Sequence, residues 1–125
     1  GVLGLSEISS DMRDIEEGME KGDEKATNAM NVYINRIVKY IGSYTALMGG
    51  VDVITFTAGA LENSSVMRKL IVDKLGFLGI ELDESVNDFR GEERVISTEN
   101  SPVKVMVIPT NEEFVIANDT FNLVK

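Results

Sequence analysis

The chain has 125 residues with 21 acidic and 12 basic side chains, a formal net charge of −9, and neither cysteine nor histidine. This length suits one domain or part of a larger one, and the acidic balance argues against nonspecific binding to nucleic acid or to an anionic membrane. The missing cysteines exclude disulfides and thiolate metal sites, while the missing histidines leave carboxylates, Lys, Arg or hydroxyls for any catalysis by this segment alone.

The sequence contains no apolar run near the roughly 18 residues of a membrane span, and its start, GVLGLSEISSD, lacks the basic region of a secretory signal. The start also lacks a Met, which suggests a segment of something longer. The composition is compatible with a reducing cytoplasm, which is the location we expect.

Two helices are expected in the first 50 residues. The first runs from Asp11 to about Gly22. The second runs from about residue 23 to residue 48, where apolar side chains recur at spacings of three and four and form one stripe: Met30, Ile34, Ile37, Ile41, Tyr44 and Met48. The pair Gly49–Gly50 is expected to end the second helix.

The rest of the chain alternates between expected strands and helices. Residues 51–57 (VDVITFT) form a short, β-branched run that predicts a buried strand, and residues 94–98 and 104–109 are two further strand candidates. Residues 79–93 are expected to be largely irregular, and residues 110–123 predict a closing helix. This order predicts the α/β class, with a mainly parallel sheet covered by helices. The sheet would be thin, which again suggests a missing portion.

Residues 65–78 predict a surface helix lying on this sheet. Its expected apolar face consists of Val66, Leu70, Ile71, Leu75 and Leu78, and its expected solvent face of Arg68, Lys69, Asp73 and Lys74.

The turn FTAGALENSS (residues 56–65) follows the first strand, where open α/β sheets bind ligands. Gly59 suits a positive φ or a close backbone approach by a ligand, and Asn63, Ser64 or Ser65 suits the N-cap of the following helix. Capping-box, P-loop and dinucleotide patterns are all absent, so N–H groups at this helix start could remain for a ligand. Spacing alone favours a structural corner over a nucleotide contact.

A second segment, PTNEE, follows the last central strand. Thr110 and Glu113 suit a capping box, which explains Glu113 structurally. Glu112 suits either a helix-dipole partner or a ligand of a divalent cation, and the pattern alone favours the former. For Asp11 and Arg13 in SSDMR, the pattern favours a helix cap and a solvated charge.

Four separated motifs together resemble the carboxyl-terminal portion of the acetate kinase (acetokinase) family: GLSEISSDMRDIE, KYIGSYTALMGGVDVITFTAGALENS, KLGFLGIELD and VIPTNEEFVIAND. The resemblance implies reversible phosphoryl transfer from ATP to acetate, giving acetyl phosphate and ADP, with Mg²⁺. It also implies the ribonuclease H-like fold of actin, heat-shock ATPases and sugar kinases, with a three-layer arrangement of helices on both sheet faces in each of two lobes. Residues 1–125 would be the nucleotide-binding part of the second lobe, without the amino-terminal lobe, in a homodimeric enzyme.

The resemblance also implies roles for particular residues. Asp11, Met12 and Arg13 fall on the family's adenosine motif. The family's second nucleotide loop falls on residues 57–63, which implies that Gly59, Ala60 and Asn63 border the purine and ribose and that Leu61 and Glu62 belong to the same site. Glu112 falls on the glutamate of the magnesium site. No catalytic residue is expected in this segment, and in isolation it is expected to be inactive.

The chain departs from the family pattern where the family usually has Ile-Gly and this chain has Ala60-Leu61. Either Leu61 packs into a gap left by the smaller Ala60, which we favour, or the loop is reshaped at the purine edge. A propionate or butyrate kinase and a noncatalytic nucleotide-binding or interaction domain remain open as alternatives.

Overall fold

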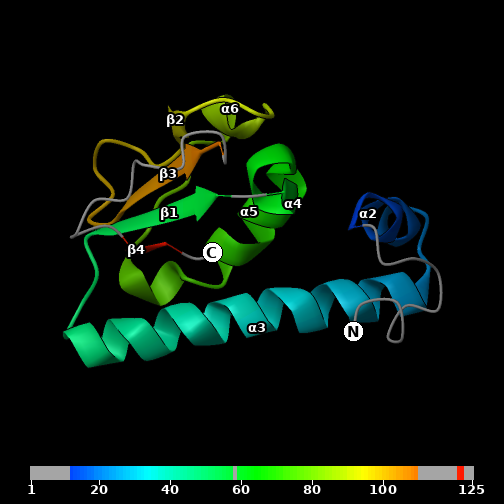
Figure 1. Ribbon diagram of the computed structural model, residues 1–125, viewed down its shortest axis with the longest axis horizontal. Coiled ribbons are helices and arrows are strands. Elements are labelled where there is room, and N and C mark those ends of the chain that lie inside the picture. The colour runs from blue at the N-terminus through cyan, green and yellow to red at the C-terminus, as the bar shows by residue number, and fades with distance from the viewer. Residues whose placement is uncertain (1–11, 58, 110–120, 123–125) are drawn as a thin grey trace. The chain divides into compact units, whose positions relative to one another are not determined.

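The computed structural model describes residues 12–57, 59–109 and 121–122. These residues form a mixed α/β structure that divides into two compact units, Gly1–Ile37 and Val38–Lys125. One long helix, α3 (Glu24–Met48), crosses the boundary between them (Figure 1).

The first unit contains α2 (Met12–Glu20) and the beginning of α3. The turn between them is built on Gly22, whose φ of 83° is in the left-handed region. The Gly22 N–H donates to the Met19 carbonyl at 3.0 Å, and the Asp23 N–H donates to the Gly18 carbonyl at 2.9 Å. This pair of bonds is the Schellman arrangement that satisfies carbonyls at a helix end. Both predicted helices are confirmed.

The apolar stripe of α3 is buried along most, but not all, of its predicted length. Its first four members, from Met30 to Ile41, are buried, whereas Tyr44 and Met48 are 47% and 56% exposed. The prediction of a continuous buried stripe is therefore wrong at its end, because periodicity shows which side chains share a face but not whether anything covers that face. The helix ends as predicted, with Gly49 at φ 77°.

The second unit contains a four-stranded sheet in the order β2-β3-β1-β4. β1 (Val53–Thr57) and β3 (Lys104–Ile108) are parallel neighbours, with Val53 opposite Lys104 and Thr57 opposite Ile108. β4 (Phe121–Asn122) pairs in parallel with β1, and β2 (Arg94–Val95) pairs antiparallel with β3. The mainly parallel sheet is confirmed, and its central strands bury their alternate apolar side chains in the core.

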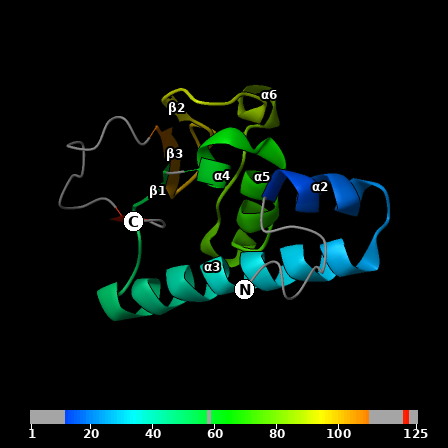
Figure 2. The same ribbon diagram turned by 45° about the vertical axis from the view of Figure 1, so that its right-hand side comes forward.

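The helices of the second unit differ from the prediction. The turn after β1 contains a short helix, α4 (Gly59–Asn63), and α5 (Ser65–Asp73) ends before residue 78. Lys74 and Leu75 donate their N–H groups three residues back, and a separate 3₁₀ turn, η1 (Gly76–Leu78), follows. This tighter hydrogen bonding ends the α-helix early. α6 (Glu84–Asn87), in the segment expected to be largely irregular, contacts α5 (Figure 2).

The predicted closing helix over residues 110–123 is wrong at Phe121–Asn122, which form strand β4. Pairing with the edge of β1 provides backbone partners that a local sequence pattern does not reveal. Residues 110–120 lie outside the described part of the chain. Among the described helices, none has the length and apolar character needed to cross a membrane.

Replacement with alanine should have opposite effects on stability at Gly42, within α3, and at Gly49, just after its end. We expect Gly49→Ala to lower the free energy of unfolding by about 1 kcal/mol, because a Cβ disfavours a φ of 77°. Gly42→Ala should raise it by about 0.5–1 kcal/mol, because Gly42 lies within the helix and an added Cβ meets no atom within 4 Å. Urea unfolding of both variants measures this, and a destabilising Gly42→Ala would contradict it.

Candidate functional site

The carboxyl ends of β1 and β3 lie at one edge of the sheet, because the two strands are parallel and in register up to Thr57 and Ile108. Their arrowheads point to the same side, where α4 lies (Figure 1). Ligands of open α/β sheets bind at such an edge. The first of the two predicted segments, residues 57–63, is therefore at the expected place.

Gly59 and Asn63 form the exposed part of α4. Gly59 has a φ of 45°, and its carbonyl accepts a 3.0 Å hydrogen bond from the Asn63 side-chain amide. A Cβ added at Gly59 would meet no atom within 4 Å, so the space beside this backbone is open. The turn thus presents backbone and an amide side chain to its surroundings, groups suited to hydrogen bonding a polar ligand.

Leu61 contributes to the core and not to the exposed surface of α4. Its side chain is 1% exposed, while Ala60 and Glu62 are half-buried. Because residue 61 lies within a helix, its backbone needs no positive φ. This geometry agrees with the favoured interpretation that Leu61 packs inward. It gives no support to the alternative that the Leu61 side chain reshapes the purine edge.

The N-cap of α5 is Ser64, one of the three candidates, and its hydroxyl accepts a 3.1 Å hydrogen bond from the Met67 N–H. The Arg68 N–H donates to the Ser64 carbonyl. The expectation that N–H groups at this helix start remain for a ligand is therefore wrong for Met67 and Arg68.

The position of Arg68 differs from the prediction for the helix over residues 65–78. Arg68 was expected on the solvent face of its helix, yet its side chain is fully buried. Its Nη1 donates to the Leu61 carbonyl at 3.0 Å, and its Nε donates to Asn87 Oδ1 at 2.9 Å. Its Nη2 donates to the carbonyls of Asn87 at 2.6 Å and of Phe89 at 2.9 Å. Every polar contact of this buried cation is thus with a neutral oxygen atom.

Two guanidinium groups lie over the Phe89 ring, that of Arg68 at 4.4 Å and that of Arg94 at 4.2 Å from its centroid. The pKa of Arg68 is lowered to about 10, mainly by burial and also by the nearby charge of Arg94, while Asp88 opposes the shift. Arg68 is still charged at neutral pH. Its ring contact therefore remains a cation–π interaction.

Two further hydrogen bonds join residues 87–91 to α4 and α5. The Asn87 amide donates to the Ser65 carbonyl at 3.0 Å, and the Gly91 N–H donates to the Glu62 carbonyl at 3.1 Å. With the bonds of Arg68, these contacts fix α4, the start of α5 and residues 87–91 as one cluster, which we call the Arg68 cluster.

The apolar pattern of residues 65–78 does not predict this cluster, although the sequence contains one signal for it. Arg68 shares a helical stripe with Ile71, Val72 and Leu75, at spacings of three, four and seven residues. All three are buried. The predicted apolar face includes Val66 and Leu70, which are only half-buried, and so it does not coincide with the buried stripe.

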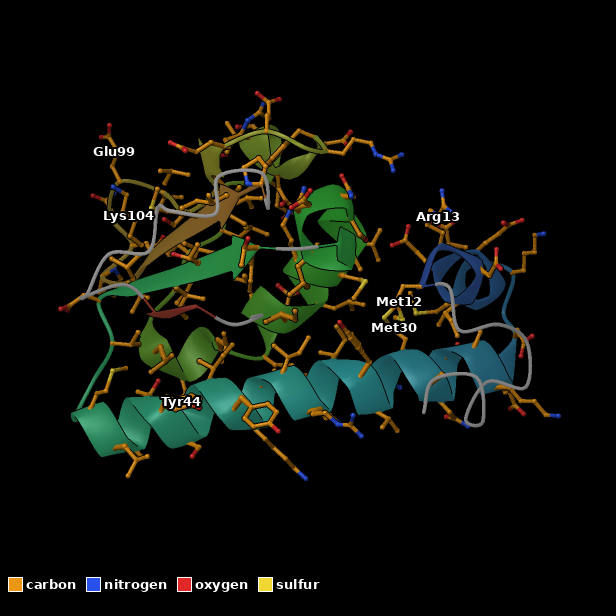
Figure 3. The ribbon with its side chains drawn as sticks, viewed as in Figure 1. Met12, Arg13, Met30, Tyr44, Glu99 and Lys104 are labelled. Carbon is orange, nitrogen blue, oxygen red and sulfur yellow. The ribbon has the colours of Figure 1, made fainter. Side chains whose placement is uncertain are left out.

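The other predicted nucleotide residues lie in the first unit or outside the described part. Arg13 is exposed on α2, and Figure 3 shows its side chain on the side of α2 away from α3; Met12 is half-buried. Asp11 lies outside the described residues. Because Met12 and α4 belong to different units, a shared site for them stays a prediction.

The predicted metal ligand Glu112 and the predicted capping pair Thr110 and Glu113 also lie outside the described residues. In the described ranges, no group of three or more Asp, Glu, His or Cys residues is placed to hold a metal ion. β3 ends at Ile108, opposite Thr57 at the end of β1.

Comparisons with known proteins agree on one family. A model of the Acetokinase family matches residues 1–118. The acetate kinase of Pseudothermotoga lettingae is 55% identical over 125 residues, which cover all of this chain and 31% of that protein. The chain therefore spans about a third of the length of the curated relatives it matches.

Two solved structures are similar in both sequence and fold. The crystal structure of Porphyromonas gingivalis acetate kinase matches with a TM-score of 0.81 and 49% identity, over 87% of this chain and 28% of that one. A propionate kinase from Francisella tularensis matches with a TM-score of 0.80 and 36% identity, over 95% of this chain and 30% of that one.

The burial of Leu61 predicts a change in stability and not in nucleotide affinity. We expect Leu61→Gly to lower the free energy of unfolding by about 3–5 kcal/mol, because it leaves a cavity and weakens a helix. Ala60→Gly is the matched control in the same helix and should cost about 1 kcal/mol. ATP affinity per folded molecule should be equal in Leu61→Gly and the parent. A different ATP affinity of Leu61→Gly, measured by calorimetry below the melting transition, would support the alternative that the loop is reshaped at the purine edge.

Proposed function

The chain belongs to the acetokinase family, and we propose that it is the carboxyl-terminal nucleotide-binding part of a cytoplasmic acetate kinase. The full-length protein would transfer a phosphoryl group reversibly between ATP and acetate. The observation that carries the proposal is the α4 turn, whose open Gly59 backbone and exposed Asn63 lie at the carboxyl edge of β1 and β3. This is the loop that the family resemblance associates with the nucleotide.

In this proposal, α4 borders the purine and ribose. The Gly59 backbone would permit close approach, because no side chain of the described residues occupies the space where its Cβ would lie. Asn63 offers an amide for hydrogen bonding, and half-buried Ala60 and Glu62 flank Leu61, whose side chain packs into the core. Residues 11–13, which fall on the family's adenosine motif, would also contact the nucleotide.

The metal contribution of this segment would come from Glu112. A single carboxylate suits Mg²⁺, which usually keeps several waters and binds one or two carboxylates together with substrate phosphates. Bound Mg²⁺ would neutralise charge on those phosphates. The contribution of the chain would be to bring Glu112 to the sheet edge that also positions α4.

The fold proposal is the second lobe of an actin-like enzyme, with the amino-terminal lobe outside this chain. Phosphoryl transfer requires in-line placement of donor and acceptor and neutralisation of charge on the transferred group. The described residues would provide one side of a nucleotide site, and the family resemblance assigns no catalytic residue to this segment. We therefore infer that residues 1–125 position a nucleotide without activating acetate.

A propionate kinase is the second candidate, favoured by the match to the Francisella tularensis structure. The two candidates differ in the acyl group accepted, and the α4 turn would serve both because ATP is common to them. Comparison of acetate and propionate as substrates of the full-length protein separates them.

We also propose a homodimer, as the family resemblance implies. The last turns of α3 expose large apolar side chains, which favours self-association: Tyr40, Tyr44, Leu47 and Met48. Sedimentation of the full-length protein at two concentrations tests this, and a monomer at both would exclude it.

If this segment positions the nucleotide and the catalytic residues lie elsewhere, only the full-length protein should be active. Purified residues 1–125 should form no acetyl phosphate from ATP, Mg²⁺ and acetate, whereas the full-length protein should form it readily. Trapping acetyl phosphate as its hydroxamate measures both reactions. A full-length, folded protein that accepts neither acetate nor propionate would contradict the kinase proposal, and activity of residues 1–125 alone would contradict this placement of the catalytic residues.

A further inference from the structure

Arg68 has no assigned part in nucleotide binding, yet its side chain is bonded to the turn that we propose contacts the nucleotide. The hydrogen-bond acceptors come from separate segments: Leu61 lies within α4, Asn87 is the last residue of α6, and Phe89 follows that helix. No carboxylate of the described residues forms a salt bridge with this buried guanidinium.

Stability alone is a weak explanation for such a residue. Removing a charge from water is costly, and well-packed apolar side chains in place of buried ions are often neutral or stabilising. The neighbouring stripe residues Ile71 and Val72 show that apolar packing is available on this face. Unlike an apolar side chain, the planar guanidinium group of Arg68 donates several hydrogen bonds in fixed directions. It can therefore fix the positions of several oxygen atoms at once.

The Leu61 carbonyl is in the middle of α4, between Gly59 and Asn63. The bond from Arg68 Nη1 therefore holds the centre of the turn, and the bond from Gly91 to Glu62 holds it one residue further on. Without the first bond, α4 would keep its connection to β1 but lose its attachment to residues 87–89.

We propose that Arg68 is a positioning residue for the nucleotide, which orients the α4 turn by linking the Leu61 carbonyl to Asn87 and Phe89 within the Arg68 cluster. Arg68 does not touch the nucleotide in this account, and the inference rests on the proposed role of α4. A displaced α4 turn would misplace Gly59 and Asn63 and so weaken the binding of the nucleotide.

The chain offers a matched control. Arg94 lies over the same Phe89 ring as Arg68, but its hydrogen bonds go to Val86 and Glu92 and not to α4. Replacing either arginine with lysine keeps the positive charge but removes the planar guanidinium group. Only the Arg68 variant loses the guanidinium hydrogen bond to the Leu61 carbonyl of α4.

The test uses the full-length kinase that contains this chain, assayed below the melting temperature of every variant. Arg68→Lys should raise the KM for ATP about tenfold, corresponding to the loss of one charge-assisted hydrogen bond. Its KM for acetate should not change. Arg94→Lys should change neither KM by more than about twofold, since it leaves the α4 link intact. A fall in kcat with both KM values unchanged would show a merely structural role and overturn the proposal.

A milder variant keeps the test decisive if Arg68→Lys does not fold. Asn87→Ala removes one acceptor of Arg68 and one donor to Ser65, while leaving the bond to Leu61. It should raise the KM for ATP about threefold, less than Arg68→Lys. An unchanged KM for ATP in this folded variant would overturn the proposal.

Asn63→Ala separates this inference from the proposed function. If Asn63→Ala raises the KM for ATP and Arg68→Lys does not, the positioning role is wrong and the nucleotide site stands. If neither Asn63→Ala nor Gly59→Val affects the KM for ATP, the nucleotide role of α4 fails, and the inference fails with it.

Discussion

The second unit depends on one constraint: a buried guanidinium must find hydrogen-bond acceptors away from water. Arg68 finds them in the carbonyls of Leu61, Asn87 and Phe89 and in the Asn87 side chain. Those oxygens would otherwise be buried with fewer partners, so the arginine and the surrounding backbone satisfy each other. This mutual requirement explains why a short helix such as α4, which would be unstable alone, has a defined position.

The sheet and the Arg68 cluster together determine which side of α4 is buried and which side is exposed. The parallel register of β1 and β3 brings the turn to the carboxyl edge of the sheet. Leu61 then faces the core, while Gly59 and Asn63 stay exposed. A family position usually occupied by Ile-Gly can therefore contain Ala60-Leu61, because the large side chain is directed inward and the exposed positions are unchanged.

Local patterns predicted the parts of the fold that depend on local physics. The second helix follows from apolar periodicity, and both of the first two helices end at glycines with positive φ, Gly22 and Gly49. The strand 53–57 lies within the β-branched run predicted as a strand over residues 51–57. Features set by distant partners were not predictable in this way. The strand at 121–122 requires the edge of β1, and the burial of Arg68 requires carbonyls about twenty residues away in sequence. The nucleotide role of α4 came from the family resemblance, since spacing alone favoured a structural corner.

Contact between α4 and the nucleotide is the step on which the proposed function depends. Hydrogen–deuterium exchange of the full-length protein, with and without ADP and Mg²⁺, measures this contact at residues 59–63. We expect slower exchange of these amides on nucleotide binding, while the amides of β3, which are already protected in the sheet, change little. Unchanged exchange at residues 59–63 under saturating ADP would contradict it.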